Sequence, residues 1–174
     1  MAILDVRDIS ISFGGLRAVS DFSLSIDREE IVSIIGPNGA GKTTVFNILS
    51  GLYRPDSGEI YLDGAPMVGK KPYEFNHLGI ARTFQNIRLF GNASVIDNLK
   101  IALNASTKYG MFDALFRTKR YLMEEKRIDE QAMEMLEIIG LSDKADMQAS
   151  NLPYGEQRRL EIGRALITQP KILF

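Results

Sequence analysis

A short stretch of this sequence combines the residue types that bind phosphate groups. It runs Gly36-Pro37-Asn38-Gly39-Ala40-Gly41-Lys42-Thr43. The glycines allow consecutive backbone N–H groups to turn inward around phosphate oxygens, Lys42 brings a positive charge to the β- and γ-phosphates, and the Thr43 hydroxyl is suited to Mg²⁺. The spacing is that of a Walker A loop and predicts nucleotide binding. The alternative is an ordinary glycine-rich turn between a strand and a helix.

The segments on either side of this loop are those that position it. Residues 31–35 form an apolar run that does not alternate with polar residues, which predicts a central strand covered on both faces. Residues 44–49 predict a helix whose positive dipole end faces the bound anion, and Thr44 therefore joins the predicted nucleotide contacts. Gly51 is expected to end this helix in a left-handed conformation.

The first part of the chain is predicted to be rich in β-structure. Apolar and polar residues alternate in residues 5–13 and 22–26, which is the period of half-buried strands. Residues 59–62 and the following Asp63-Gly64 turn predict a hairpin. Residues 80–84 predict another buried strand.

The later part of the chain is predicted to be mostly helical. Ser94 and Asp97 have the spacing of a capping box, which begins a helix. A longer helix is predicted for residues 119–139, with an apolar stripe and with Gly140 at its C-terminal cap. A second loop-to-helix junction is predicted at residues 155–167. The side chains expected to point mostly outward from this last helix are Arg158, Arg159 and Glu161.

Composition and charge exclude several classes of protein. The 174 residues are 45% apolar, enough for a folded core, and carry a net charge of −1. The basic cluster in residues 117–120 is better explained as a solvated helix end than as a nucleic-acid-binding face. Cysteine is absent, no run approaches the roughly 18 apolar residues of a membrane span, and the N-terminus does not follow the signal-peptide pattern. A membrane role is therefore expected to be peripheral, and no nucleic-acid partner is expected.

The Walker A loop, an upstream aromatic residue, a downstream glutamine and a second anion-ready helix start together resemble the ATP-binding cassette (ABC) ATPases of ABC transporters. The resemblance covers essentially the whole chain. It implies an α/β fold: a P-loop NTPase core with an N-terminal antiparallel β-subdomain and an inserted α-helical subdomain. We assign residues 1–92 to the β-rich nucleotide-binding core, 93–155 to the α-helical signature subdomain, and 156–174 to the signature helix and the start of the Walker B strand.

The resemblance assigns roles to two further residues. Phe13 lies where the family places an aromatic ring that stacks on adenine, and the alternative is a core residue at the end of a strand. Gln85 resembles the glutamine whose side-chain oxygen reaches Mg²⁺ or the attacking water, in a loop expected to touch a membrane subunit. Its alternative is a polar surface residue. The resemblance thus implies Lys42 and Gln85 as catalytic residues, and Thr43 and Gln85 as Mg²⁺ ligands.

The second helix start resembles the ABC signature in an altered form. In place of Leu-Ser-Gly-Gly-Gln the chain reads Leu152-Pro153-Tyr154-Gly155-Glu156. The resemblance implies that Gly155 and Glu156 begin a helix that faces the γ-phosphate held by a second subunit. Pro153 supplies neither a hydroxyl nor an N–H, and Glu156 replaces an amide with a carboxylate, so the contact is expected to differ in strength. The alternative is a simple turn before a helix.

Residues 13–19, residues 81–90 and the Leu-Pro-Tyr-Gly form of the signature resemble the ATP-binding subunit of branched-chain amino-acid importers. This resemblance implies ATP and Mg²⁺ as cofactors and a cytoplasmic, peripheral position on the inner face of the cell membrane. The implied partners are a second ABC ATPase subunit, identical or a paralogue, membrane permease subunits and, indirectly, a periplasmic substrate-binding protein. The alternatives are an ABC ATPase for another cargo, such as lipopolysaccharide export, and a soluble ABC protein that acts on nucleic acid or ribosomes.

The last residues of the sequence bear on the activity of the chain. Residues 171–174 resemble the beginning of a buried strand, after which the family places the Walker B aspartate and the catalytic glutamate. His77 precedes Gln85, does not match the family's switch histidine, and is expected at the surface. We therefore expect the N-terminal portion of a longer ATPase, incomplete at its C-terminus, that binds nucleotide weakly and hydrolyses it poorly. A binding-only fragment is the alternative.

Overall fold

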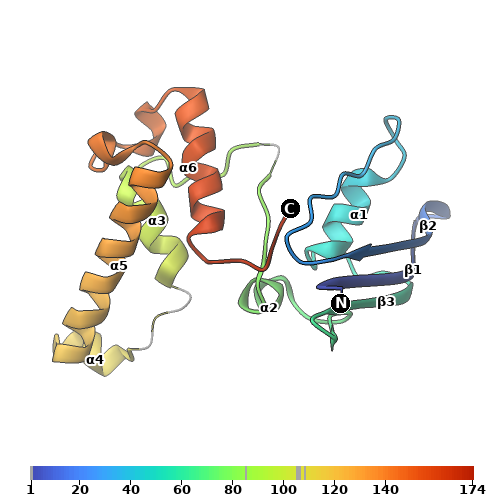
Figure 1. The fold of residues 1–174 in the computed structure, drawn as a ribbon, viewed down its shortest axis with the longest axis horizontal. Coiled ribbons are helices and arrows are strands. Elements are labelled where there is room, and N and C mark those ends of the chain that lie inside the picture. The colour runs from blue at the N-terminus through green and yellow to red at the C-terminus, as the bar shows by residue number, and fades with distance from the viewer. Residues whose placement is uncertain (1, 85, 105–106, 108) are drawn as a thin grey trace. The chain divides into compact units, whose positions relative to one another are not determined.

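The computed structural model describes residues 2–84, 86–104, 107 and 109–174. It divides into two compact units, which are considered separately. The first unit comprises Met1–Ala81 and Phe174, and the second comprises Arg82–Leu173. The first is organised around a sheet and the second around helices (Figure 1).

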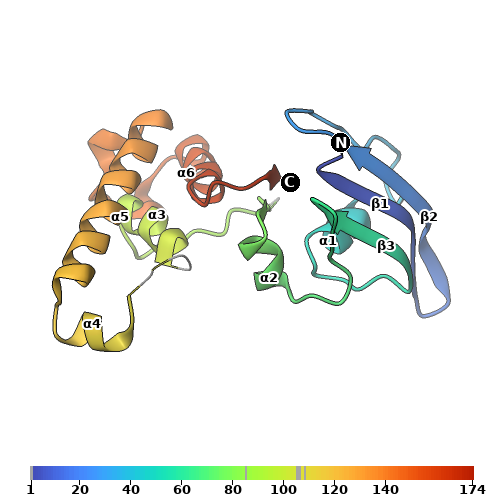
Figure 2. The ribbon, with the colours of Figure 1, turned by 60° about the horizontal axis from the view of Figure 1, so that its bottom comes forward.

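The first unit contains a four-stranded antiparallel sheet in the order β2-β1-β3-β4. Figure 2 shows β1 between β2 and β3. Its strands are β1 (Leu4–Phe13), β2 (Leu16–Ile26), β3 (Ser57–Leu62) and β4 (Ala65–Pro66). The remaining elements of the unit are α1 (Lys42–Leu49), α2 (Pro72–His77) and β5 (Ile80–Ala81). The strands predicted from alternating residues are confirmed, including the hairpin through Asp63-Gly64.

A bulge in β1 explains an irregularity in its apolar pattern. Leu4 and Val6 are buried at even positions, whereas Ile9 and Ile11 are buried at odd positions. Between them Asp8 has a positive φ of 50°, and the register with β2 shifts after Val6. One extra residue at the bulge returns the apolar side chains to the same face of the sheet, so both halves of β1 contribute to one core.

Helix α1 ends as the sequence predicts. Val45, Ile48 and Leu49 are its buried residues. Gly51 has a φ of 75°, and its N–H donates to the carbonyl oxygen of Ile48 at 3.0 Å. This left-handed residue satisfies a carbonyl group at the end of the helix and turns the chain away. His77 is exposed on α2, as expected for a surface residue.

The prediction of a buried strand at residues 31–35 is wrong. In the described chain this run is not a strand, and Ile31 and Ile35 are 96% and 92% exposed. A strand buried on both faces needs hydrogen-bonded neighbours at its edges and covering layers above and below. β1 to β4 pair with one another and leave this run without such neighbours. The predicted strand at residues 80–84 is shorter than expected, because β5 ends at Ala81.

The second unit is helical, as predicted. Its elements are α3 (Val95–Asn104), α4 (Met111–Leu115), α5 (Lys119–Ile138), the 3₁₀ turns η1 (Ser142–Lys144) and η2 (Ala149–Asn151), α6 (Tyr154–Leu166) and β6 (Ile172–Leu173). Leu99 on α3, Leu136 on α5 and Leu160 on α6 are 0% exposed and belong to one apolar core. That core fixes α6, which carries the signature residues, against α3 and α5.

The predicted helix ends are present in this unit. The Ser94 hydroxyl accepts a hydrogen bond from the Asp97 N–H at 3.1 Å at the beginning of α3. Gly140 follows α5 with a φ of 65°, and the next N–H, from Leu141, donates to the Leu136 carbonyl at 2.8 Å. None of the described helices is long and apolar enough to span a bilayer.

Candidate functional site

The predicted phosphate loop is a tight turn that leads directly into α1. Gly39 and Gly41 have φ values of 84° and 81°, and the Ala40 N–H donates to the Pro37 carbonyl at 3.2 Å. Gly41 is the N-cap of α1, so the helix begins at Lys42, slightly before the predicted start at Thr44. The positive end of the α1 dipole therefore lies within the loop.

The chemistry of this helix start fits an anion. No side chain caps the N-terminus of α1, and its first turn contains no acidic residue. The first N–H groups of a helix have no partner within the helix and are satisfied by caps, by water or by ligands. Thr43 is exposed in the same turn. The residues present therefore fit a phosphate group, and the Thr43 hydroxyl is available to a cation bound with it.

Lys42 lies across the loop. Its Nζ donates to the carbonyl oxygens of Gly36 and Pro37, both at 2.7 Å. These contacts hold the ammonium group on the loop and keep it close to the helix start. A phosphate that enters the loop competes with the two carbonyl oxygens for this cation.

The two left-handed glycines of the loop differ in their surroundings. A Cβ atom on Gly41 would lie 2.5 Å from the Ala18 carbonyl oxygen, whereas a Cβ on Gly39 would meet nothing within 4 Å. Gly41 is therefore required both by its backbone conformation and by its contact with β2. Gly39 is required by conformation alone.

We expect Gly41→Ala to lower the free energy of unfolding by more than about 3 kcal/mol, because the left-handed strain and the clash with β2 add. Gly39→Ala is the matched control and is expected to cost about 1 kcal/mol, since only the strain applies. Urea denaturation of the two variants measures the difference. Equal losses of stability would contradict the clash with Ala18.

Phe13 is at the end of β1 and is 45% exposed, so it is not a core residue. Its ring meets the ring of Tyr53 edge to face, with centroids 5.3 Å apart. Tyr53 follows the end of α1 and is 40% exposed. Tyr53 was not among the predicted site residues, although an aromatic residue two positions after the helix stop at Gly51 is a signal in the sequence. The pair offers two aromatic side chains in the unit that carries the phosphate loop.

Gln85 lies outside the described residues, but Phe84 beside it is held by α6. Arg158 Nη1 donates to the Phe84 carbonyl oxygen at 2.6 Å and to Glu161 Oε2 at 2.7 Å. Glu161 Oε1 accepts a longer hydrogen bond, 3.5 Å, from the Phe84 N–H. The residue before Gln85 is therefore bound through both of its backbone groups. Glu161 is only 6% exposed, so the prediction that it points outward is wrong.

The chain after Gln85 is also fixed within the second unit. Arg164 donates to the Arg88 carbonyl oxygen, and its guanidinium lies 5.0 Å from the centre of the Phe90 ring. Burial lowers the pKa of Arg164. Asn98, at 0% exposure, accepts a hydrogen bond from the Phe90 N–H at 2.9 Å and donates to the Phe90 carbonyl at 3.1 Å. These polar residues were missed by the sequence analysis because their types are usually exposed.

The altered signature begins α6. Leu152 is buried, and Pro153 is the N-cap of the helix. The N–H of Glu156 is bonded to the Pro153 carbonyl at 2.9 Å, so the N–H groups without a helical partner are those before it. A Cβ on Gly155 would meet nothing within 4 Å, which leaves this helix start open.

The Glu156 carboxylate does not stand alone at this helix start. Its Oε1 accepts a hydrogen bond from Lys144 Nζ at 2.6 Å, and Arg159 Nη2 lies 3.7 Å from the same oxygen. These cations offset the negative charge that replaces the usual amide. An acidic residue in the first turn is also favourable for the helix dipole.

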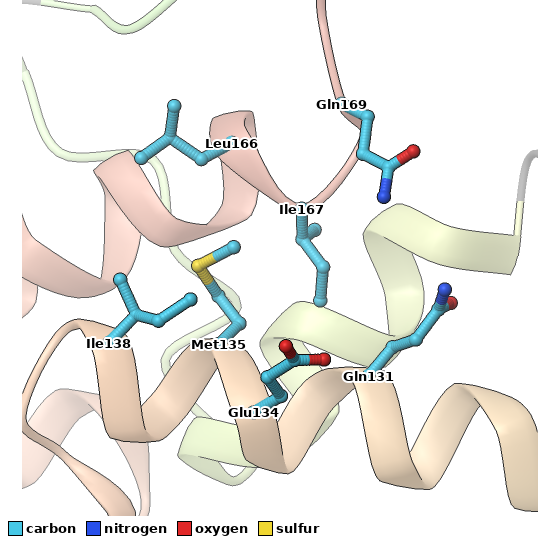
Figure 3. Close-up of a pocket in the computed structure, with 7 residues that line it drawn as sticks. All are labelled: Gln131, Glu134, Met135, Ile138, Leu166, Ile167 and Gln169. Carbon is cyan, nitrogen blue, oxygen red and sulfur yellow. The ribbon is translucent and has the colours of Figure 1, made fainter.

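A pocket of about 150 Å³ lies between α5 and the end of α6 (Figure 3). Figure 3 shows Met135 projecting into it, with Glu134 and Gln169 among the polar side chains at its border. Its lining has no cation to meet a phosphate, and its volume is below the roughly 300 Å³ of a small-molecule site. Met135 is partly buried and packs against the apolar core of this unit.

Comparison with known families decides the classification. The family model for the ABC transporter matches residues 19–174. The chain belongs to the ABC transporter family. The α/β ABC ATPase fold that the sequence resemblance implied is therefore confirmed.

Named relatives of this ABC transporter chain agree with that classification. It is 46% identical over 171 residues to the high-affinity branched-chain amino acid transport ATP-binding protein LivG of Escherichia coli (strain K12), an alignment that covers 98% of this chain and 67% of LivG. BraF of Pseudomonas aeruginosa, named for the same transport, is 42% identical with the same coverage. This ABC chain spans about two thirds of the length of these relatives.

Solved structures of other ABC cassettes have the same fold. An ATP-binding cassette of an ABC transporter in its ADP conformation superposes with a TM-score of 0.82 at 35% identity and covers 99% of this chain and 67% of that one. The structure of cbiO1 of Clostridium perfringens, part of the ABC transporter complex cbiONQ, superposes with a TM-score of 0.79 at 26% identity. The match covers 99% of this chain and 64% of cbiO1. Members of this family bind ATP, and the family is one of ATP hydrolases coupled to transport.

Proposed function

We propose that this chain belongs to the ATP-binding subunit of an ABC importer for branched-chain amino acids. The observation that carries the proposal is the uncapped start of α1, with Lys42 lying across the phosphate loop, in a chain 46% identical to LivG. The uncapped helix and the lysine account for nucleotide binding. The proposed cargo, branched-chain amino acids, is taken from the names of LivG and BraF.

In this proposal residues 36–44 surround the phosphates of ATP. Lys42 exchanges its two carbonyl contacts for oxygens of the β- and γ-phosphates, which keeps a cation where negative charge develops during transfer to water. Thr43 and Gln85 hold Mg²⁺, which would neutralise charge on the β- and γ-phosphates when bound. The described residues contain no cluster of His, Cys, Asp and Glu that could hold a metal. Phe13 stacks on adenine.

The proposed partners follow from the importer function. Gly155 and Glu156, at the start of α6, face the ATP bound by a second subunit, identical or a paralogue. The helical residues 93–155 and the loop at Gln85 transmit closure to membrane permease subunits, which receive cargo from a periplasmic binding protein. The core is formed by residues 1–92, and residues 156–174 carry the signature helix. The subunit works at the cytoplasmic face of the membrane.

We also propose that the 174 residues alone bind ATP but hydrolyse it slowly. No residue from 167 to 174 is acidic, and in the family the general base follows an apolar strand of this kind. A fluorescent ATP analogue with Mg²⁺, combined with phosphate release in the same sample, separates binding from turnover. Binding with little phosphate release is the expected result. Turnover equal to that of a complete relative would overturn the proposal.

The cargo is tested in cells. Disruption of the gene that encodes this chain is expected to lower uptake of labelled leucine, isoleucine and valine, because the permease would lose its source of ATP-driven closure. Uptake of labelled lysine is the control and is expected to be unchanged. Unchanged leucine uptake, together with a defect in the cell envelope, would favour an ABC ATPase for lipopolysaccharide export instead.

A further inference from the structure

Helix α4 exposes its apolar side chains more than its one charged residue. Met111, Phe112, Leu115 and Phe116 are 84%, 77%, 73% and 71% exposed. Asp113 is partly buried, and its carboxylate accepts hydrogen bonds from the Thr118 hydroxyl at 2.8 Å and the Gly110 N–H at 3.2 Å. This is the reverse of an ordinary surface helix, whose apolar side faces the core.

The exposed apolar surface continues onto the first turns of α5. Leu122 and Met123 are 54% and 74% exposed. We call the exposed apolar residues of α4, of its C-cap and of the first turns of α5 the apolar tip, which comprises Met111, Phe112, Leu115, Phe116, Leu122 and Met123. Figure 1 and Figure 2 both show α4 at the beginning of α5 and away from α6. The apolar tip is therefore remote, within the second unit, from the signature residues.

Unpaired positive charge lies in the same segment. Arg117, Lys119 and Arg120 are exposed and make no ion pair within the described chain. Asp113 is the acidic residue of residues 111–123. Hydrogen bonds from Thr118 and Gly110, together with the positive charge of Arg120, lower its pKa. Two of the three cations, Arg117 and Lys119, are therefore left without an opposite charge in this segment.

The cations further along α5 are paired with carboxylates. Arg127 pairs with Glu124 at 2.6 Å, and Lys126 lies 3.6 Å from Glu130. Net positive charge is thus concentrated where the apolar side chains are exposed, in a chain whose total charge is −1.

We propose that the apolar tip binds the surface of a membrane that contains anionic lipid. Large apolar side chains next to Lys and Arg match the acyl boundary and the anionic headgroups of a bilayer, and such segments lie in the interface without spanning it. An apolar groove on a protein would account for the aromatic rings but not for the excess of unpaired cations around them. This lipid contact goes beyond the proposed function, because an ATPase subunit held by its permease needs no lipid contact of its own.

Co-sedimentation of the purified chain with lipid vesicles tests this inference. Binding is expected to mixed phosphatidylglycerol–phosphatidylcholine vesicles, and little binding to phosphatidylcholine alone. The double variant Phe112→Ser/Phe116→Ser is expected to bind at least about tenfold more weakly. Replacing Arg117, Lys119 and Arg120 by glutamine is expected to lower the affinity for these vesicles about fivefold for each cation removed. Raising the salt from roughly 0.1 M to 1 M is expected to weaken binding of the unchanged chain.

The control is Ile138→Ser, which removes an apolar side chain that is 68% exposed at the other end of α5. It is expected to bind vesicles like the unchanged chain, and circular dichroism checks that every variant is folded. No binding to anionic vesicles would overturn the proposal. So would a dimer in light scattering that the Phe112→Ser/Phe116→Ser variant abolishes, because the tip would then cover a second copy. Loss of vesicle binding leaves ATP binding unaffected, so this outcome is separate from the proposed function.

Discussion

Alanine in place of Lys42 is expected to lower the affinity for ATP by about a hundredfold or more. The ammonium group would contact two phosphates, and a hydrogen bond to a charged group contributes about 1.5–3 kcal/mol, so losing both contacts costs roughly 3 kcal/mol at least. Titration with a fluorescent ATP analogue and Mg²⁺ measures the change.

Lys70→Ala is the matched control for this experiment, since it removes a lysine from the same unit but outside the phosphate loop. Its affinity for ATP is expected to equal that of the unchanged chain. If Lys42→Ala bound the nucleotide as tightly as Lys70→Ala, the phosphate contact of Lys42 would be ruled out.

The second large effect is expected from Asn98→Leu, which should lower the free energy of unfolding by about 2–4 kcal/mol. Leucine has a similar volume, so the change leaves little cavity. It does leave both backbone groups of Phe90 without their side-chain partner in a site where Asn98 is 0% exposed, and each unsatisfied group costs about 1–3 kcal/mol.

Urea denaturation measures this loss. Asn104→Leu is the matched control, because Asn104 is the exposed last residue of the same helix and its replacement is expected to change stability by less than about 0.5 kcal/mol. A loss of the same size in both variants would show that Asn98 does not hold Phe90.

The sequence predicts those parts of the fold that depend on local pattern. Local patterns predict the strand β1 from its alternation, the helix ends at Gly51 and Gly140, and the helix start at Ser94. In each of them the physical cause lies within a few residues of the sequence. The phosphate loop is of this kind as well. Its glycines and Lys42 act within one turn, so their placement follows from spacing alone.

The rest depends on partners that spacing does not specify. The run at residues 31–35 is apolar enough to be buried, but burial needs neighbouring strands, and in the described chain Ile31 and Ile35 are exposed. The opposite error occurs at Glu161, where a charged residue is buried because Arg158 and the backbone of Phe84 satisfy it. Polarity alone predicts exposure and misses such pairing. The roles of Phe13, Gln85 and the signature residues stay predictions.

The attachment of the chain on both sides of Gln85 has a consequence for amide hydrogen exchange. The Phe90 N–H is bonded to a fully buried side chain of α3, and the Phe84 N–H to a buried carboxylate of α6. Amides of this kind exchange only when the structure that protects them opens. Although residues 84–90 contain no helix or strand among those described, we expect these two amides to exchange at the rate of the helices, as one cooperative unit with the second half of the molecule.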